Sequence, residues 1–298
     1  MTRSQLGLVS LVRRALAGTY GFLKRDKFAM AGAVIYAFFI LVAVFAPYIA
    51  PYDPHELVID GSELASDRPP SSRHLLGTTN MGRDIFSQLV YGARPALTVG
   101  FSAAFFVVVL GTLVGLLSGY FRGWVDTALM RLADVAFGVP FEPFVIVLVG
   151  FLGPSVWNIV LAMALLLWRD TARVIRSQVL TIRERSFIEA ARVSGASHLR
   201  IMFVYIAPNI LPLSFLYGSL AVGWAILTEA AVSFLGFGDP DVISWGYMLH
   251  DAYVSQALSR GAFHWFVPPG ICIMLTVMAG FYLGRGSEEI LHPRLKDV

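Results

Sequence analysis

Long apolar runs dominate this chain and leave few folds open to it. A helix that crosses a membrane needs about 20 predominantly apolar residues, because each residue advances about 1.5 Å through a hydrocarbon core of about 30 Å. Only 14% of the residues are charged, against about 25% in a soluble domain. Six runs meet or approach the required length: 28–46, 97–120, 127–151, 155–168, 210–235 and 262–283. We therefore predict an all-α membrane protein with six transmembrane helices.

Prolines and run length refine these boundaries. Pro47 is expected just past the first helix, and it argues against a cleavable signal peptide. Pro140 lies near the middle of the third run and predicts a kink. The run 155–168 is short, so we expect its helix to continue out of the membrane.

The charges give the orientation. Segments 1–27 and 169–208 are rich in lysine and arginine, whereas the loop 51–96 is acidic and 237–261 holds a single arginine. The positive-inside rule places both termini and 169–208 in the cytoplasm. The net charge of +3 is then a topology signal, which makes nucleic-acid binding a poor interpretation.

Four segments follow from this topology. They are a cytoplasmic N-terminal segment (1–27), a first transmembrane helix with an extracytoplasmic loop (28–96), a core of five transmembrane helices (97–284) and a cytoplasmic tail (285–298). Within the outer loop, 81–91 is predicted to form a surface helix that lies flat on the membrane and ends at Gly92. Its apolar face holds Met81, Ile85, Phe86, Leu89 and Val90.

The sequence lacks the motifs of catalytic and metal sites. Cys272 is the single cysteine, and the six histidines are scattered. None of the lysines lies in a Gly-x-x-x-x-Gly-Lys-Ser/Thr phosphate loop, and neither His-Glu-x-x-His nor Gly-x-Ser-x-Gly occurs. We predict a chain that is not an enzyme and holds no cofactor or metal, so any ATP would be hydrolysed by another subunit.

The cytoplasmic loop before the fifth run predicts two short helices at an angle. Ser186 and Glu189 form Ser-x-x-Glu, the pattern of a capping box. Gly195 is suited to end the first helix. Ser197 is expected to cap the second helix and Pro208 to stop it, with an apolar stripe of Ile201, Val204 and Tyr205. Such a knob suits docking to a cytoplasmic partner, although a helix hairpin with a structural role alone has the same pattern.

This loop resembles the EAA loop of ABC importer permeases. The matching residues, with the core of the loop at 183–208, are Glu189, Ala190, Ala191, Gly195 and Pro208. Tyr205 and Ala207 replace the isoleucine and leucine of the family pattern. The resemblance implies that these residues couple the chain to ATPase subunits, with Glu189 anchoring the contact and Gly195 shaping it.

Nearly the whole chain is similar to the second (C-type) permease of the dipeptide and oligopeptide importers. The matching motifs are His74-x-x-Gly77-Thr78, Gly82-Arg83-Asp84, Tyr91-Gly92-Ala93-Arg94, Trp168-x-x-x-Ala172-Arg173, Glu229-Ala230-Ala231-x-Ser233-Phe234-Leu235-Gly236 and Ser244-Trp245-Gly246. The C-terminus departs from the family pattern at Gly284-Arg285-Gly286-Ser287 and His292-Pro293-Arg294.

This resemblance implies a type I ABC importer permease fold and a set of partners. They are a related permease subunit in a heterodimer, two ATPase subunits that carry ATP and Mg²⁺, an extracytoplasmic substrate-binding protein, and the lipid of a prokaryotic cytoplasmic (inner) membrane. Peptides are the expected substrate. The alternatives are oligosaccharides, nickel or glutathione carried by the same machinery, and an ion-coupled secondary transporter, although no internal repeat supports the last.

Ionisable groups inside spans are costly and mark candidate substrate-pathway residues. Glu142 follows Pro140 in the third run and is a candidate for binding cationic groups in the pore. Glu229, in the fifth run, is more simply explained as a hydrogen bond to a neighbouring helix. The remaining intramembrane features have structural explanations: close packing for Gly111, Gly115 and Gly119, and charge pairing at the inner membrane edge for Asp126, Arg131 and Asp134.

Overall fold

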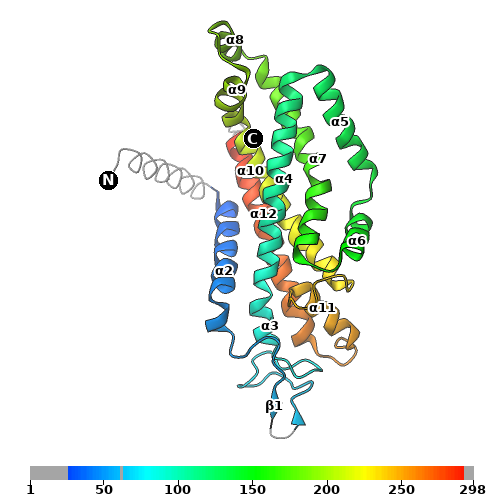
Figure 1. Cartoon of the computed structure of the whole chain (residues 1–298). Helices are drawn as coiled ribbons and strands as arrows, with labels where there is room; N and C mark the ends of the chain where they lie inside the picture. The colour runs from blue at the N-terminus through cyan, green and yellow to red at the C-terminus, as the bar shows by residue number, and fades with distance from the viewer. Residues whose placement is uncertain (1–25, 61–62, 292–298) are drawn as a thin grey trace, which may run out of the picture.

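The computed structural model describes residues 26–60 and 63–291 (Figure 1). Long helices lie side by side, with the short helices α8 and α9 at one end of the bundle and a small β-hairpin at the other (Figure 1). Most of the predicted N-terminal segment, at 1–25, and the end of the predicted tail, at 292–298, lie outside the described residues.

The elements follow the apolar runs closely. The helices are α2 (Lys27–Ile49), α3 (Ile85–Tyr91), α4 (Ala93–Phe121), α5 (Gly123–Gly138), α6 (Phe141–Leu152), α7 (Val156–Arg183), α8 (Ser186–Val193), α9 (His198–Arg200), the π-helix η1 (Ile201–Ile206), α10 (Ala207–Phe234), α11 (Trp245–Val254) and α12 (Phe263–Leu291). The strands β1 (Ile59–Asp60) and β2 (Glu63–Leu64) pair antiparallel in the outer loop.

The number of spans differs from the predicted six. In the described residues, length and composition give four helices able to cross a membrane: α2, α3 with α4, α9 to α10, and α12. The pair α5 and α6 makes a fifth if it is one broken span. Apart from its N-cap Ser155, the run 155–168 lies in α7, a single helix of 28 residues. The second half of α7 is charged, and these charges keep α7 out of the set of four helices.

The break in the third run is sharper than a kink. α5 ends at Gly138 and α6 begins at Phe141, at an angle of 85°. Pro140 lies at the N-cap of α6, and Val139 before it is extended (φ −89°, ψ 121°). A proline disfavours helical geometry in the preceding residue and cannot donate a backbone hydrogen bond, so the helix stops and restarts here.

Pro47 lies inside α2 rather than past its end, so this predicted boundary was wrong. A proline within a helix leaves the carbonyl four residues earlier without its donor. That carbonyl belongs to Ala43, and the Nε of Arg94 on α4 donates to it at 2.7 Å. A side chain distant in the sequence therefore allows the helix to continue through Pro47.

The predicted surface helix 81–91 also differs from the helix in the structure. α3 is shorter, begins after its N-cap Asp84, and buries Ile85 and Val90 inside the protein rather than lying on the membrane. Gly92 does not end the helical path, because its backbone is right-handed helical (φ −60°) and α4 begins at the next residue. A Cβ at Gly92 would lie 2.6 Å from Cδ1 of Trp245, so glycine is needed there for packing.

α4 and α7 make the most extensive helix contact among the described residues, and their backbones come close together. A Cβ added to Gly111 would lie 2.6 Å from Cβ of Thr171, one on Gly115 would lie 2.6 Å from the carbonyl oxygen of Ala172, and one on Gly119 would meet Val179 at 2.8 Å. Small residues let helix backbones approach closely in membranes. These contacts support the predicted packing role of the three glycines.

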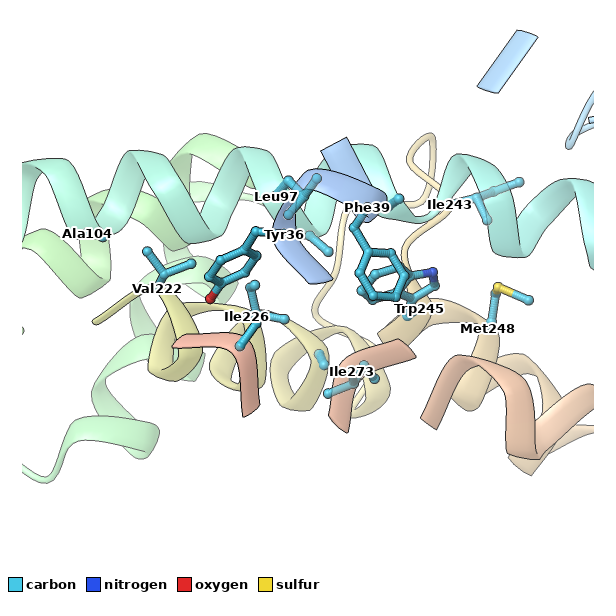
Figure 2. Close-up of a cluster of buried hydrophobic side chains, with 14 of the residues drawn as sticks. Tyr36, Phe39, Leu97, Ala104, Val222, Ile226, Ile243, Trp245, Met248 and Ile273 are labelled. Carbon is cyan, nitrogen blue, oxygen red and sulfur yellow. The ribbon is translucent and has the colours of Figure 1, made fainter. Parts of the chain in front are cut away.

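A buried apolar cluster fixes α2 against the bundle (Figure 2). Tyr36 and Phe39 of α2 point into it, and the ring of Phe39 meets that of Trp245 edge-on at a centroid distance of 5.3 Å. Ile226 of α10 and Leu97 of α4 belong to the same cluster. This half of the bundle is therefore built around residues from α2, α3, α4, α10, α11 and α12.

We expect Gly115→Leu to destabilise the protein by about 1–3 kcal/mol, the usual cost of overpacking, since its new side chain would meet the backbone of α7. Thermal unfolding of the purified protein in detergent measures this loss. Gly270→Leu in α12 is the matched control, because a Cβ there meets nothing within 4 Å. Equal melting temperatures for the two variants would contradict the close α4–α7 contact.

Candidate functional site

The first helix of the knob, defined here as residues 186–206, is α8. Its N-cap is Arg185, which makes no side-chain cap, so the predicted capping box of Ser186 and Glu189 is absent. Ser186 is already helical and Glu189 is exposed. Gly195 follows the end of α8 with φ +76°, as predicted for a left-handed helix end.

The second half of the knob does not stop at Pro208. Ser197 caps α9 as predicted, accepting a hydrogen bond from the amide of Arg200 at 3.3 Å. The chain then passes through the π-helix η1 directly into α10, where Pro208 occupies the first turn. Because η1 and α10 are continuous, Pro208 lies inside one helical path, and its missing N–H removes one backbone donor beside the π-helix.

The knob is held firmly under the bundle. Ile188 of α8 and Ile201 of η1 are fully buried in a cluster that continues into α7 and α4. The ring nitrogen Nδ1 of His198 lies 2.8 Å from the hydroxyl of Tyr120 at the end of α4. Of the predicted apolar stripe, Ile201 is buried whereas Val204 is exposed. Any force on the knob is therefore passed to α4, α7 and α10.

The knob also presents apolar side chains to its surroundings. Val193 is 85% exposed and Leu199 is 65% exposed, beside the exposed Glu189. The full set of exposed large apolar residues on the knob is Phe187, Val193, Leu199, Phe203 and Val204. This many exposed large apolar side chains in so short a segment make the knob a candidate interaction surface.

Charge pairs join α5 to α7 at the end of the bundle near the knob. Arg176 donates to both carboxylate oxygens of Asp126 at 2.6 Å, and Arg173 donates to Asp134 at 2.6 Å. Arg131 lies 3.8 Å from Asp134. The predicted pairing of Asp126, Arg131 and Asp134 is therefore present, with the partners supplied by α7.

The predicted pathway residues occupy different environments. Glu142 is exposed in the first turn of α6, directly after the break at Pro140, and has no ion-pair partner among the described residues. Glu229 is only 3% exposed and accepts a hydrogen bond from the hydroxyl of Ser233 at 2.7 Å. Ser244, the N-cap of α11, also hydrogen-bonds to it. Glu229 thus joins α10 to α11.

Sequence reasoning missed one feature. A cavity of about 320 Å³ lies between α4, α6, α7 and α10, and Arg169 and Asp170 are among its lining residues. These two charges directly follow the run 155–168 and were interpreted only as part of the cytoplasmic loop. The 28-residue length of α7 places them in mid-helix, and a continuous helical pattern beyond Trp168 was the available signal.

At the end of the bundle opposite the knob (Figure 1), the family-like motifs join separate segments. Nδ1 of His74 lies 2.9 Å from Oδ1 of the fully buried Asp84. Arg260 donates to Asp67 at 2.6 Å and so connects the two outer loops. The indole nitrogen of Trp245 donates to the carbonyl of Leu89 at 2.9 Å. These loops therefore form one connected outer surface.

The chain matches two family models. Residues 111–297 match the model described as binding-protein-dependent transport system inner membrane component. Residues 21–70 match the N-terminal TM domain of oligopeptide transport permease C.

Named relatives and a solved structure agree with this match. The dipeptide transport system permease protein DppC of Alkalihalophilus pseudofirmus is 37% identical over 282 residues, covering 92% of this chain and 88% of that protein. The glutathione transport system permease protein GsiD of Pectobacterium atrosepticum is 36% identical over 274 residues, covering 92% and 89%. A structure of the MetNI methionine ABC transporter in inward-facing conformations shares the fold, with a TM-score of 0.54, 18% identity, and coverage of 69% of this chain and 95% of that chain.

The matched region covers α5 to α12 and the part of α4 from Gly111 onward, and it includes the knob and the broken helix. The chain therefore belongs to the family of binding-protein-dependent transport system inner membrane components, as a permease of the ABC importer class.

Proposed function

We propose that this chain forms half of the translocation pore of an ATP-driven importer of di- or oligopeptides. In this proposal it pairs with a related permease, and two ATPase subunits and an extracytoplasmic binding protein complete the importer. The similarity to a dipeptide permease over 92% of the chain carries the proposal. The glutathione permease supports it further, because glutathione is itself a peptide.

The knob is the proposed contact with an ATPase. Its exposed apolar residues flank Glu189, Ala190 and Ala191 of the EAA-like motif, while Ile188 anchors the same helix in the bundle. A partner that moves the knob would therefore also move α7 and α10. Gly195 would shape the turn at its tip, and Pro208 would begin the helix that carries the movement into the membrane.

We further propose six spans, with α7 as the fourth and both termini in the cytoplasm of a prokaryote. α7 is apolar before Arg169, and afterwards Arg173 and Arg176 pair with acids of α5. It packs against α4 from Gly111 to Gly119. A helix with its charges paired and its backbone against a spanning helix is suited to the membrane despite its composition.

For the substrate pathway we propose the break around Pro140, with Glu142 exposed beside it. Broken helices line cavities in membrane proteins, since their free backbone groups need water or protein partners. Glu229 would act less directly, by holding α11 against α10 at the outer end.

The substrate alternatives differ in chemistry. Nickel has little support, because no group of three or more histidine, cysteine, aspartate or glutamate residues suitable for a metal occurs among the described residues. Oligosaccharides remain the main alternative to peptides. An ion-coupled transporter would take up substrate without ATP, so ATP dependence of uptake in reconstituted vesicles separates it from the proposed importer.

A thermal-shift panel on the cognate binding protein tests the substrate class. Ligand at 100 times its dissociation constant stabilises a protein by about 2.7 kcal/mol, so a true substrate gives a clear rise in melting temperature. We expect a rise with di- and tripeptides and none with neutral oligosaccharides. The reverse pattern would contradict the peptide proposal.

We expect Gly195→Val, and likewise Glu189→Ala, to lower ATP-driven transport at least about tenfold while the protein still inserts. A β-branched residue at φ +76° strains the turn by about 1–2 kcal/mol, and the new side chain faces outward, where a Cβ meets nothing within 4 Å. Uptake and ATPase stimulation in reconstituted vesicles measure the effect.

Gly261→Val is the matched control for this experiment. Gly261 has φ +72° and similarly open surroundings, but lies in the loop between α11 and α12, away from the knob. Normal transport and ATPase stimulation by Gly195→Val would show that the coupling assignment is wrong.

We expect Glu142→Gln to reduce uptake of peptides with a cationic side chain relative to neutral peptides, by about three- to tenfold for one lost charge contact of about 1 kcal/mol. Competition uptake with lysine-containing and alanine-containing peptides measures the ratio. Glu56→Gln, which removes an exposed acid from the outer loop, is the control. Unchanged selectivity in Glu142→Gln would contradict the proposed place of Glu142 in the substrate pathway.

A further inference from the structure

The cavity between α4, α6, α7 and α10 combines apolar walls with two charges. Aromatic residues on two helices line it, namely Phe141 on α6 and Tyr217 and Trp224 on α10. Among its lining residues only Arg169 and Asp170 are charged. A volume of about 320 Å³ lies at the small end of the range for ligand sites.

The cavity lies at membrane depth. Its lining residue Thr171 packs against Gly111, which belongs to the apolar run 97–120 of α4. On the other side, Gly218 of α10 faces Val108 of the same run. Arg169 lies two helical turns, about 10 Å, from Arg176, which pairs with Asp126 nearer the knob.

Arg169 is buried and only partly hydrogen-bonded. It is 9% exposed, its Nη1 donates to the carbonyl of Ala136 at the end of α5, and its guanidinium lies over the ring of Phe137 at 4.5 Å. Its Nε has no hydrogen-bond acceptor in the described structure. The nearest carboxylate oxygen, Oδ2 of Asp170, is 3.7 Å from Nε, which is too far for a hydrogen bond. Nε itself is enclosed by protein, but Arg169 is among the residues that line the cavity, and its positive charge is only partly neutralised there.

Asp170 shows which way the cavity opens. Its side chain is 54% exposed, and Trp224 on the opposite wall is 53% exposed. A carboxylate exposed to lipid at this depth would be strongly unfavourable, whereas one facing a water-filled pathway is tolerated. The cavity therefore opens towards the translocation pathway.

We propose that this cavity receives the C-terminal carboxylate of a peptide during its passage, with the guanidinium of Arg169 as the donor. The inference rests on the proposed peptide-import function and adds a recognition site to it. Charge-assisted hydrogen bonds of this kind are stronger than neutral ones. The aromatic walls accommodate the adjoining side chain. A neutral oligosaccharide has no carboxylate and gains nothing from Arg169.

Asp170 competes with the substrate for Arg169. In the empty cavity its carboxylate neutralises Arg169 at ion-pair distance without completing a hydrogen bond. An incoming carboxylate takes the place of this loose pairing and is released again as the peptide moves on. A pathway needs such weak and reversible binding, since tight binding would stop transport.

The test uses the assembled importer in vesicles with its binding protein, and trialanine and trialanine amide as probes. The amide lacks the carboxylate and is otherwise matched. Both are used at concentrations that saturate the binding protein, as checked by thermal shift. We expect the acid to be transported about tenfold faster than the amide by the unmodified protein, and this preference to vanish in Arg169→Gln.

Arg173→Gln is the matched control, because Arg173 lies one turn further along α7, over the same Phe137 ring at 3.9 Å, yet pairs with Asp134. It should keep the preference for the acid. Equal transport of the two probes by the unmodified protein, or a preference that survives in Arg169→Gln, overturns the assignment. If neither probe is transported, the peptide-import function itself fails.

Asp170→Asn provides a second test that does not depend on the folding of Arg169→Gln. Removing the competing carboxylate should strengthen the preference for trialanine over its amide beyond that of the unmodified protein. An unchanged or weaker preference in Asp170→Asn contradicts the competition and with it the proposed site.

Discussion

The backbone contact between α4 and α7 is the interaction on which the other features depend. Three glycines bring the two helices close enough for Thr171 and Ala172 to lie against α4. Helix association within lipid relies on such packing, because lipid tails are as apolar as leucine and no hydrophobic force drives helices together. With α7 fixed in this way, its charged half has set partners on α5, and its end positions the knob.

The break between α5 and α6 follows from the same arrangement. A helix end inside a membrane leaves carbonyl groups without donors, which is costly in the absence of water. Arg169 from α7 donates to Ala136 near the end of α5, and a cation at a helix C-terminus is also electrostatically favourable. The residue that stabilises the broken helix is thus the one that lines the cavity beside it.

Much of the helical framework could be predicted from the sequence, because long apolar runs and charge asymmetry act locally. The runs 97–120, 210–235 and 262–283 lie within α4, α10 and α12 almost residue for residue, apart from Leu235 and Ala262. The boundaries that failed depend on distant partners. Pro47 remains helical because Nε of Arg94 donates a hydrogen bond to the carbonyl of Ala43. Gly92 is followed directly by α4, and the indole of Trp245 packs against it. Both contacts join residues that are far apart in the sequence, so the local spacing of apolar and polar residues does not predict them.

The same distinction holds for the candidate sites: features set by local sequence were predictable, and features set by distant contacts were not. The positive φ at Gly195 was predictable because a left-handed helix end strongly favours glycine. Arg169 and Asp170 were interpreted as topology signals, since a count of arginines treats every position of 169–208 alike. The two kinds of charge differ in their depth in the membrane. A charge at the inner edge indicates the orientation of the chain, whereas a charge level with Gly111 needs a partner within the membrane. The position of Arg169 and Asp170 along the bundle is known only from the packing of α7 on α4. This packing makes the two residues candidates for a binding site.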